Sequence, residues 1–298
     1  MPLESLRLRQ PSELDLPSLV LSRTESLPRH MEVRDRTVGV QLRALLPLLR
    51  HAIADRNVNR KGVRRRLRVR HDARLIAILN GDDDHLEALW GMDRNKVFHA
   101  LARMGIGTIT GPTYSISGET ASNPASHNLT MFLRHHRYCS EAANTGLQVI
   151  PNVYWRNADD RSAWVKWLDD NPEVAWISRD FSRTKQWVSF EAELAGLIGI
   201  IKLVARPISV VVLGVGAEKM LATHHRLAEV GARISFVSSS PIVRPPVGVP
   251  AISREDAIRN GIREHRRLAS GFTSRVDDGN GLLAMELVVL KRRFVSTR

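Results

Sequence analysis

Six short apolar runs, each ending in polar residues, constrain the fold of this chain more than any other feature. The stretches between them have helical patterning and span about 20 to 30 residues, which is the spacing of βα units. Strands connected in this way are parallel, and their carboxyl ends form the face where open sheets and barrels bind ligands. The runs lie at 75–84, 108–115, 147–155, 174–180, 208–216 and 233–241.

The predicted helices support this reading. Gly105, Gly146 and Gly231 follow three of them, at the place where a left-handed cap residue is expected. A seventh apolar run, 282–291, could add a strand, and eight strands would close an ordinary barrel. We therefore predict an α/β fold with a parallel (β/α) barrel-like domain, an incomplete or modified barrel, with an open doubly wound sheet as the alternative. The helices are expected at 86–104, 125–144, 162–171, 188–204, 218–230 and 254–270.

The first 72 residues differ from the rest. Pro2, Pro11, Pro17 and Pro28 favour an extended arm over a helix. From residue 38 to residue 54 the leucines fit an amphipathic or buried helix. We expect residues 1–72 to form an N-terminal arm and helix with a basic segment, and residues 73–298 to form the barrel-like domain.

The chain is strongly basic, with 44 Lys and Arg against 31 Asp and Glu and a net charge of +13. This favours nucleic acid or another polyanion as a partner, although an arginine excess can also reflect a GC-rich genome. The densest basic run either tracks phosphates or is a solvated face, and alternation with Leu67 and Val69 suggests an exposed strand at its end. Its cations are Arg60, Lys61, Arg64, Arg65, Arg66, Arg68 and Arg70.

A single cysteine, Cys139, excludes an internal disulfide and a cysteine-based zinc site. Its helix-like surroundings favour a buried packing role over a nucleophile. No apolar run is long enough for a membrane span, and the start of the chain lacks the apolar core of a secretory signal. These features predict a cytoplasmic protein with no membrane partner.

Polar residues at the ends of the predicted strands form the candidate catalytic site. Carboxylates from different strands suit a hard cation such as Mg²⁺, with Asp82 and Asp84 as its candidate ligands, and Arg179 could bind an anion. The alternative is structural, since aspartates just before a helix commonly cap its first turn, and Arg179 with Asp180 could be a local ion pair. The candidate catalytic residues are Asp82, Asp84, Asn152, Arg179 and Asp180.

Three motifs between residues 75 and 216 point to a known family. The most specific begins at Gly146 and continues as Val149-Ile150-Pro151-Asn152-Val153-Tyr154-Trp155. Together the motifs resemble the bacterial and phage family called domain of unknown function 4417, over about half of the chain. That resemblance implies a similar architecture and a DNA-related role, with no defined activity. The other matching residues are Asp82, Asp83, Trp90, Pro112, Tyr114 and Ser115.

The leading functional prediction is a mobile-element or phage-type nucleic-acid-associated protein that binds DNA or RNA mainly through phosphates. One alternative is a metal-dependent enzyme acting on a phosphate or glycosidic bond at the carboxyl ends of the strands. Another is a non-catalytic interaction scaffold, because fold does not fix function. Convergence of the strand-end polar groups would favour the enzyme.

Overall fold

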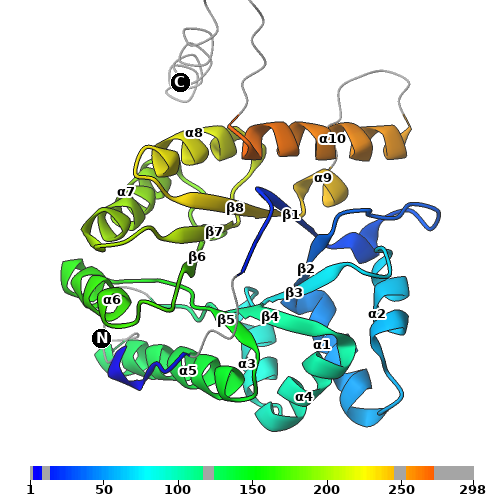
Figure 1. Ribbon diagram of the computed structural model, residues 1–298, viewed down its shortest axis with the longest axis horizontal. Helices are drawn as coiled ribbons and strands as arrows, with labels where there is room; N and C mark the ends of the chain where they lie inside the picture. The colour runs from blue at the N-terminus through cyan, green and yellow to red at the C-terminus, as the bar shows by residue number, and fades with distance from the viewer. Residues whose placement is uncertain (1–2, 9–13, 117–123, 245–252, 272–298) are drawn as a thin grey trace, which may run out of the picture.

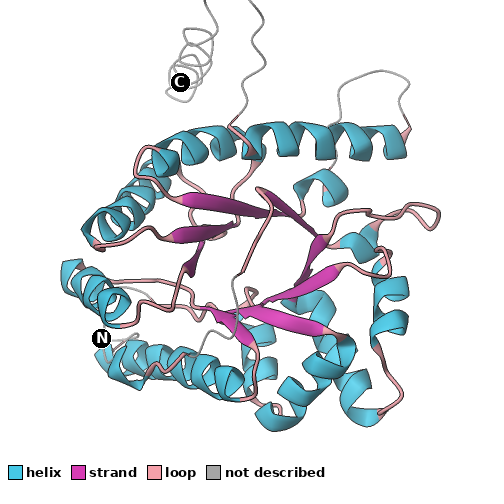
Figure 2. Ribbon diagram, in the orientation of Figure 1, coloured by secondary structure: helices cyan, strands magenta, loops and turns pink. Residues whose placement is uncertain are grey.

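Eight parallel strands form the centre of the molecule (Figures 1 and 2). The computed structural model describes residues 3–8, 14–116, 124–244 and 253–271. Neighbouring strands follow the order β5-β4-β3-β2-β1-β8-β7-β6, and helices surround them. The predicted (β/α) barrel is confirmed. The strands are β1 (Leu19–Ser22), β2 (Thr37–Gln41), β3 (Arg74–Ile78), β4 (Ile106–Thr110), β5 (Gln148–Ile150), β6 (Trp176–Asp180), β7 (Ser209–Leu213) and β8 (Arg233–Ser238).

The barrel is closed by a narrow seam between β5 and β6. An isolated parallel bridge joins Asn152 to Ser178. The Val153 nitrogen donates to the Ser178 oxygen at 2.8 Å, and the Ser178 nitrogen donates to the Pro151 oxygen at 2.8 Å. The eight strands therefore form a nearly closed barrel, in which β5 and β6 meet through one isolated bridge and no continuous ladder.

Several predicted helices match the observed ones closely, and 125–144 matches α5 at both ends. The predicted helix 86–104 is instead two helices, because the chain turns at Gly91 and restarts at Asp93, whose side chain accepts from the Lys96 nitrogen at 3.2 Å. The α-helices are α1 (Leu42–Ala54), α2 (Arg60–Leu67), α3 (Asp83–Trp90), α4 (Arg94–Met104), α5 (Ala125–Asn144), α6 (Ala158–Asp170), α7 (Trp187–Leu203), α8 (Ala217–Ala228), α9 (Ser240–Val243) and α10 (Arg254–Ala269).

Two of the eight strands come from residues 1–72. Strand β1 pairs with β2 and β8, and β2 pairs with β3, so the N-terminal part of the chain completes the barrel. The expected boundary between an arm and a barrel at residue 72 is therefore corrected. Strand β1 has only four residues and lies beside Pro17, so its pattern is weak, whereas β2 includes the first residues of the helix predicted over 38–54, which begins only at Leu42. The predicted strand 282–291 lies outside the described residues.

The interior of the barrel is apolar and is closed at the amino-terminal end of the strands. Side chains alternate along each strand, so Val20, Ile78 and Leu213 cluster inside while their neighbours pack against the helices. Leu14 joins this inner cluster, and its carbonyl accepts a hydrogen bond from Trp176 Nε1 at 2.8 Å. The segment before β1 therefore plugs one end, and the other end is the mouth.

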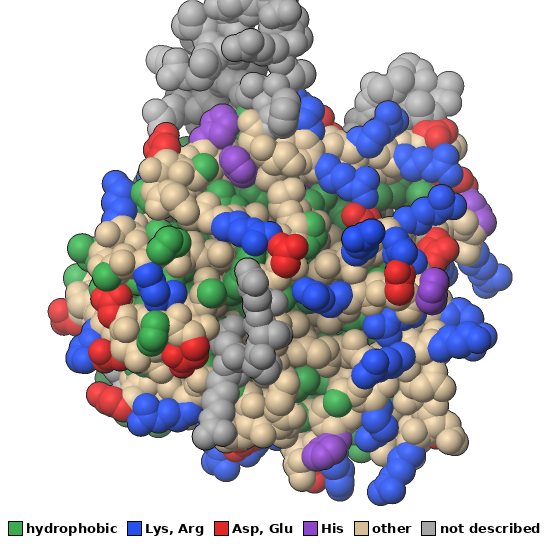
Figure 3. Space-filling model, viewed as in Figure 1, with side chains coloured by type: hydrophobic (Ala, Val, Ile, Leu, Met, Phe, Trp, Pro, Cys, Tyr) green, Lys and Arg blue, Asp and Glu red, His purple; other side chains and the backbone are tan. Residues whose placement is uncertain are grey.

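The basic run forms helix α2, which corrects the expected exposed strand. Asn59 caps the helix, accepting from the Gly62 nitrogen at 3.0 Å. Arg64 is buried and donates to the carbonyl of Ala73 from Nε at 3.0 Å and from Nη2 at 2.7 Å. Burial, with Arg60 nearby, lowers the pKa of the Arg64 guanidinium. Lys and Arg side chains gather around α2 on the face shown in Figure 3.

No helix in the described part of the chain is both long enough and apolar enough to cross a membrane.

Candidate functional site

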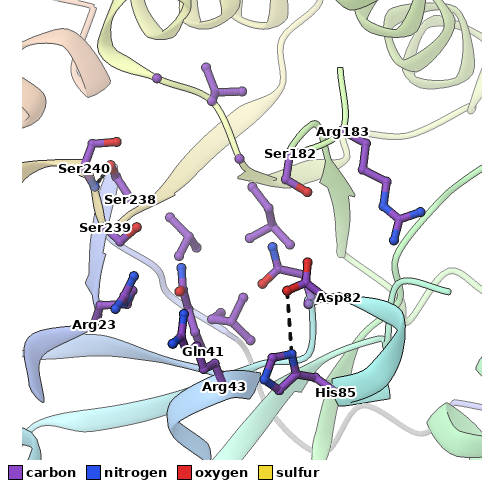
Figure 4. Close-up of a pocket in the computed structure, with 18 of the residues that line it drawn as sticks. Arg23, Gln41, Arg43, Asp82, His85, Ser182, Arg183, Ser238, Ser239 and Ser240 are labelled. Atoms are coloured by element: carbon purple, nitrogen blue, oxygen red, sulfur yellow. Dashed lines mark hydrogen bonds and ion pairs between the residues drawn. The ribbon is translucent and has the colours of Figure 1, made fainter. Parts of the chain in front are cut away.

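A pocket of about 760 Å³ opens at the barrel mouth, where the strands end (Figure 4). The carboxyl ends of six of the eight strands, with the residues that follow them, contribute to its wall, and Ile78, Leu213 and Val237 form its apolar base. This is the end at which (β/α) barrels bind their ligands. The polar lining residues are Arg23, Gln41, Arg43, Asn80, Asp82, His85, Ser182, Arg183, Lys185, Ser238, Ser239 and Ser240, with Gly81, Gly214 and Gly216 between them.

The pocket is positively charged. Four Lys and Arg side chains line it, against the single carboxylate of Asp82. Arg23 has a partner in Glu25 at 3.8 Å. Arg43 and Lys185 are exposed and pair with no carboxylate among the described residues. Their charges are therefore available to an anion that enters the pocket.

Arg183 belongs to a small network at the rim of the pocket. Its Nη2 donates to Asp83 Oδ1 at 3.0 Å, which joins the loop after β6 to the start of α3. Ser115, in the loop after β4, also donates to Asp83. The Ser115 hydrogen bond is the main cause that lowers the pKa of Asp83, and Arg183 adds to the effect. Both members of the ion pair are well exposed, so a ligand can compete for Arg183.

In the wall formed by the loops after β7 and β8, a ligand can approach the backbone closely. Gly216 is the N-cap of α8 and supplies no side-chain cap, so the first-turn N–H groups of this helix have no side-chain acceptor there. A Cβ atom on Gly216 would meet nothing within 4 Å, so the space beside it is open. On the other side of this wall, the Ser240 nitrogen donates to Ser238 Oγ at 3.3 Å.

Polar side chains also rise from the opposite wall. Gln41 is held in place by donating from Nε2 to Ser22 Oγ at 3.2 Å. His85 Nδ1 lies 3.8 Å from Asp82 Oδ2, in the pair marked in Figure 4. Because neutral imidazole exchanges a proton near neutral pH, His85 is the pocket residue best suited to move a proton.

The two predicted metal ligands are not brought together at the pocket. Asp82 lines it, whereas Asp84 is an exposed residue in the first turn of α3 and is not part of the lining. Among the described residues, no group of three or more His, Cys, Asp or Glu side chains is arranged to hold a metal ion. The described residues therefore supply no third protein ligand for Mg²⁺ beside Asp82 and Asp84.

Arg179 faces away from the mouth. Residues 179 and 180 are adjacent in a strand, so their side chains point to opposite faces of the sheet. Arg179 is buried on the helix side, donating from Nη1 to the Val153 oxygen at 2.9 Å and pairing with Glu193 of α7. Its guanidinium carbon lies 4.1 Å from the centre of the Trp155 ring, and burial lowers its pKa. Arg179 is thus a structural contact in this fold.

The remaining two candidates lie near the mouth but outside the pocket lining. Asp180 Oδ1 accepts from the Ser182 nitrogen at 2.8 Å, which fixes the turn after β6. Asn152 is fully buried at the β5–β6 seam, where its Oδ1 lies 3.5 Å from Ser178 Oγ. The predicted catalytic set is therefore divided among the mouth, the seam and the helix layer.

None of the pocket's four cations was predicted as a site residue. Arg23 and Arg43 follow β1 and β2, which were not recognised as strands. Arg183 and Lys185 lie just beyond the predicted strand 174–180, in a loop that was not considered. Collecting every polar residue within five positions of a strand end would have found these two. Ser238, Ser239 and Ser240 lie at the end of the predicted run 233–241.

The comparisons with known proteins show no family for this chain. No family model and no curated protein sequence matches the chain, so the resemblance to domain of unknown function 4417 stays a prediction. A xylose isomerase domain protein from Planctomyces limnophilus shares 13% identity, with a TM-score of 0.45, over 87% of this chain and 99% of that one. Another, from Alicyclobacillus acidocaldarius, shares 14% with a TM-score of 0.44, over 85% and 100% of the two chains.

The leading functional prediction is wrong. The segment expected to follow phosphates is a short helix in which Arg64 is buried on backbone carbonyls and Arg70 pairs with Asp72. Two cations of the basic run, Arg64 and Arg70, are thus held by contacts within the protein.

Proposed function

We propose that this protein binds a small molecule carrying a phosphate group in the barrel mouth. The observation that carries the proposal is a pair of cations, Arg43 and Lys185, that have no carboxylate partner in the described part of the chain and line a pocket that also opens onto the start of α8. Loops after the seventh and eighth strands are a frequent phosphate site in (β/α) barrels. A helix N-terminus adds backbone N–H groups and a favourable dipole for an anion.

The size and composition of the pocket support a small ligand. A volume of about 760 Å³ is within the range of ordinary ligand pockets, and the base is apolar while the walls are polar. The ligand's phosphate would be bound by Arg43 and Lys185, and Gln41 and His85 would contact the rest of the ligand. His85 would then be the group that donates or accepts a proton if the ligand reacts.

The experiment is titration of the purified protein with inorganic phosphate by isothermal titration calorimetry. Arg43→Ala and Lys185→Ala should each lower the affinity about tenfold, which corresponds to about 1.4 kcal/mol for one lost charged hydrogen bond. Arg50→Ala is the matched control, because Arg50 is exposed on the same helix as Arg43, two turns away from the mouth. Equal affinity in all variants, or no saturable binding by the unchanged protein, would reject the proposal.

A further inference from the structure

Lys219 is a buried lysine without a carboxylate partner among the described residues, next to the candidate phosphate site. It lies in the first turn of α8, three positions after Gly216, and is only 8% exposed. A cation in the first turn opposes the helix dipole, and burial of an ammonium group costs free energy unless its donors are satisfied. A residue with two such costs needs a compensating set of contacts.

The compensating contacts all come from the loop between β6 and α7 and from the start of α7. Lys219 Nζ donates to the Thr184 oxygen at 3.3 Å and to the Lys185 oxygen at 3.1 Å. It also lies 4.6 Å from the centre of the Phe190 ring and 5.5 Å from that of Trp187. The Lys219 side chain of α8 thus holds the backbone at Thr184 and Lys185.

The loop that Lys219 holds supplies the pocket with Ser182, Arg183 and Lys185. These side chains are exposed, and Figure 4 shows Ser182 and Arg183 on the wall opposite Ser238–Ser240. The loop is also held by the Asp180 turn, by the pair between Arg183 and Asp83, and by contacts to the end of β7, where the Phe181 nitrogen donates to the Leu213 oxygen at 2.9 Å and Ser182 packs on Gly214. Of these, the contact to Lys219 is the one that ties the loop to α8.

We propose that Lys219 is a positioning residue that fixes the 181–186 loop against α8 and thereby sets the anion affinity of the mouth. The inference has a structural half, that Lys219 fixes the loop, and a functional half, that the fixed loop sets the anion affinity. Only the functional half rests on the proposed phosphate site. Lys219 does not line the pocket, so its effect on a ligand passes through the loop backbone that carries Arg183 and Lys185.

Limited trypsin digestion tests the structural half, because Arg183 and Lys185 are themselves cleavage sites in an exposed loop. Lys219→Met keeps the length of the side chain but loses both hydrogen bonds. We expect it to increase the rate of cleavage after Arg183 and Lys185 at least tenfold, relative to cleavage after Lys166 in α6. Lys219→Arg, which keeps donors and charge, should restore most of the protection. Lys202→Met, at an exposed lysine of α7, is the matched control and should leave the rate unchanged.

Phosphate titration of the same variants tests the functional half. Lys219→Met should bind inorganic phosphate about tenfold more weakly than the unchanged protein, with Lys219→Arg in between. Unchanged cleavage in Lys219→Met overturns the inference, whatever happens to phosphate binding. Faster cleavage together with unaltered phosphate affinity overturns its functional half. If the unchanged protein binds no phosphate while cleavage is accelerated, the proposed function fails and the role of Lys219 in fixing the loop stands.

Discussion

Gly214 lies so close to the backbone of Ser182 that a Cβ atom at residue 214 would stand 2.3 Å from the Ser182 nitrogen. Gly214 also has a φ of +73°, a conformation that side-chain-bearing residues rarely adopt. The loops after β6 and β7 are thus in direct backbone contact at the wall of the pocket. Neither loop can move far without the other.

The first prediction concerns this contact. Gly214→Ala should destabilise the fold, since the left-handed conformation alone costs about 1–3 kcal/mol for a residue with a side chain, and the clash adds to it. Urea unfolding should show the loss, together with weaker binding of phosphate. The control is Gly199→Ala within α7, where a Cβ atom meets nothing within 4 Å. That change should raise stability by about 0.5–1 kcal/mol. An unaltered midpoint for Gly214→Ala would contradict the contact.

The second prediction is that Cys139 is chemically inert in the folded protein. Its side chain is fully buried in α5, and burial raises the pKa of the thiol well above its usual value. His135 Nε2 lies 3.7 Å from the sulfur. The position of this ring is fixed by a backbone hydrogen bond, because its Nδ1 donates to the Pro112 carbonyl at 2.8 Å. Iodoacetamide should label Cys139 only after unfolding in guanidinium chloride. Rapid labelling of the native protein would show that the thiol is accessible.

The third prediction follows from the same histidine. Burial lowers the pKa of His135 to about 4 from an ordinary value near 6.5, so in the folded protein the ring stays neutral. Between these two values the unfolded chain binds a proton that the folded chain does not. Stability is therefore complete above about pH 6.5 and falls as the pH drops towards 4, by about 3 kcal/mol for this one group.

Urea unfolding between pH 7 and pH 4.5 measures this loss. Burial also lowers the pKa values of His224 and His265, and the lowered pKa values of Glu141 and Glu264 add to the loss near pH 4.5, so several residues share the total slope. His135→Asn, which can still donate to the Pro112 carbonyl, should reduce the slope without removing it. A variant with the same pH dependence as the unchanged protein would assign the effect to the other residues.

Strand prediction succeeded for apolar runs that lie between two predicted helices. The runs around β3, β6, β7 and β8 were recognised because apolar residues there are consecutive, as buried parallel strands require. Strand β1 was missed because four residues beside a proline carry little periodic signal, and β2 was missed because its valines were assigned to the start of a helix. The closure of the barrel depends on these two strands, so it could not be deduced without them.

The location of the candidate site was predicted correctly, but most of the residues that line it were not. The mouth was expected at the carboxyl ends of the strands, and Asp82 and Ser238–Ser240 do lie there. Arg179 was assigned to it because the strand's alternation was not applied: a side chain next to the inward-facing Asp180 must point outward. Whether an exposed cation such as Arg43 lacks a carboxylate partner is a tertiary property that no local pattern reports.

The last prediction concerns Arg179 as a clamp across the β5–β6 seam. The Arg179 side chain extends from β6, and its guanidinium donates to the Val153 carbonyl beyond β5 and pairs with Glu193 of α7. It thus spans the seam, where a single bridge joins the two strands. Arg179→Met should lower stability by about 1–3 kcal/mol through the lost charged hydrogen bonds. Amide hydrogen exchange at Val153 and Ser178 should accelerate more than exchange in the continuous β7–β8 ladder. Arg183→Met, at an exposed arginine four residues further on, should leave the seam protected. Uniform acceleration across the barrel in Arg179→Met would mean that the residue supports the whole fold, and retained protection at the seam would mean that the strands close without it.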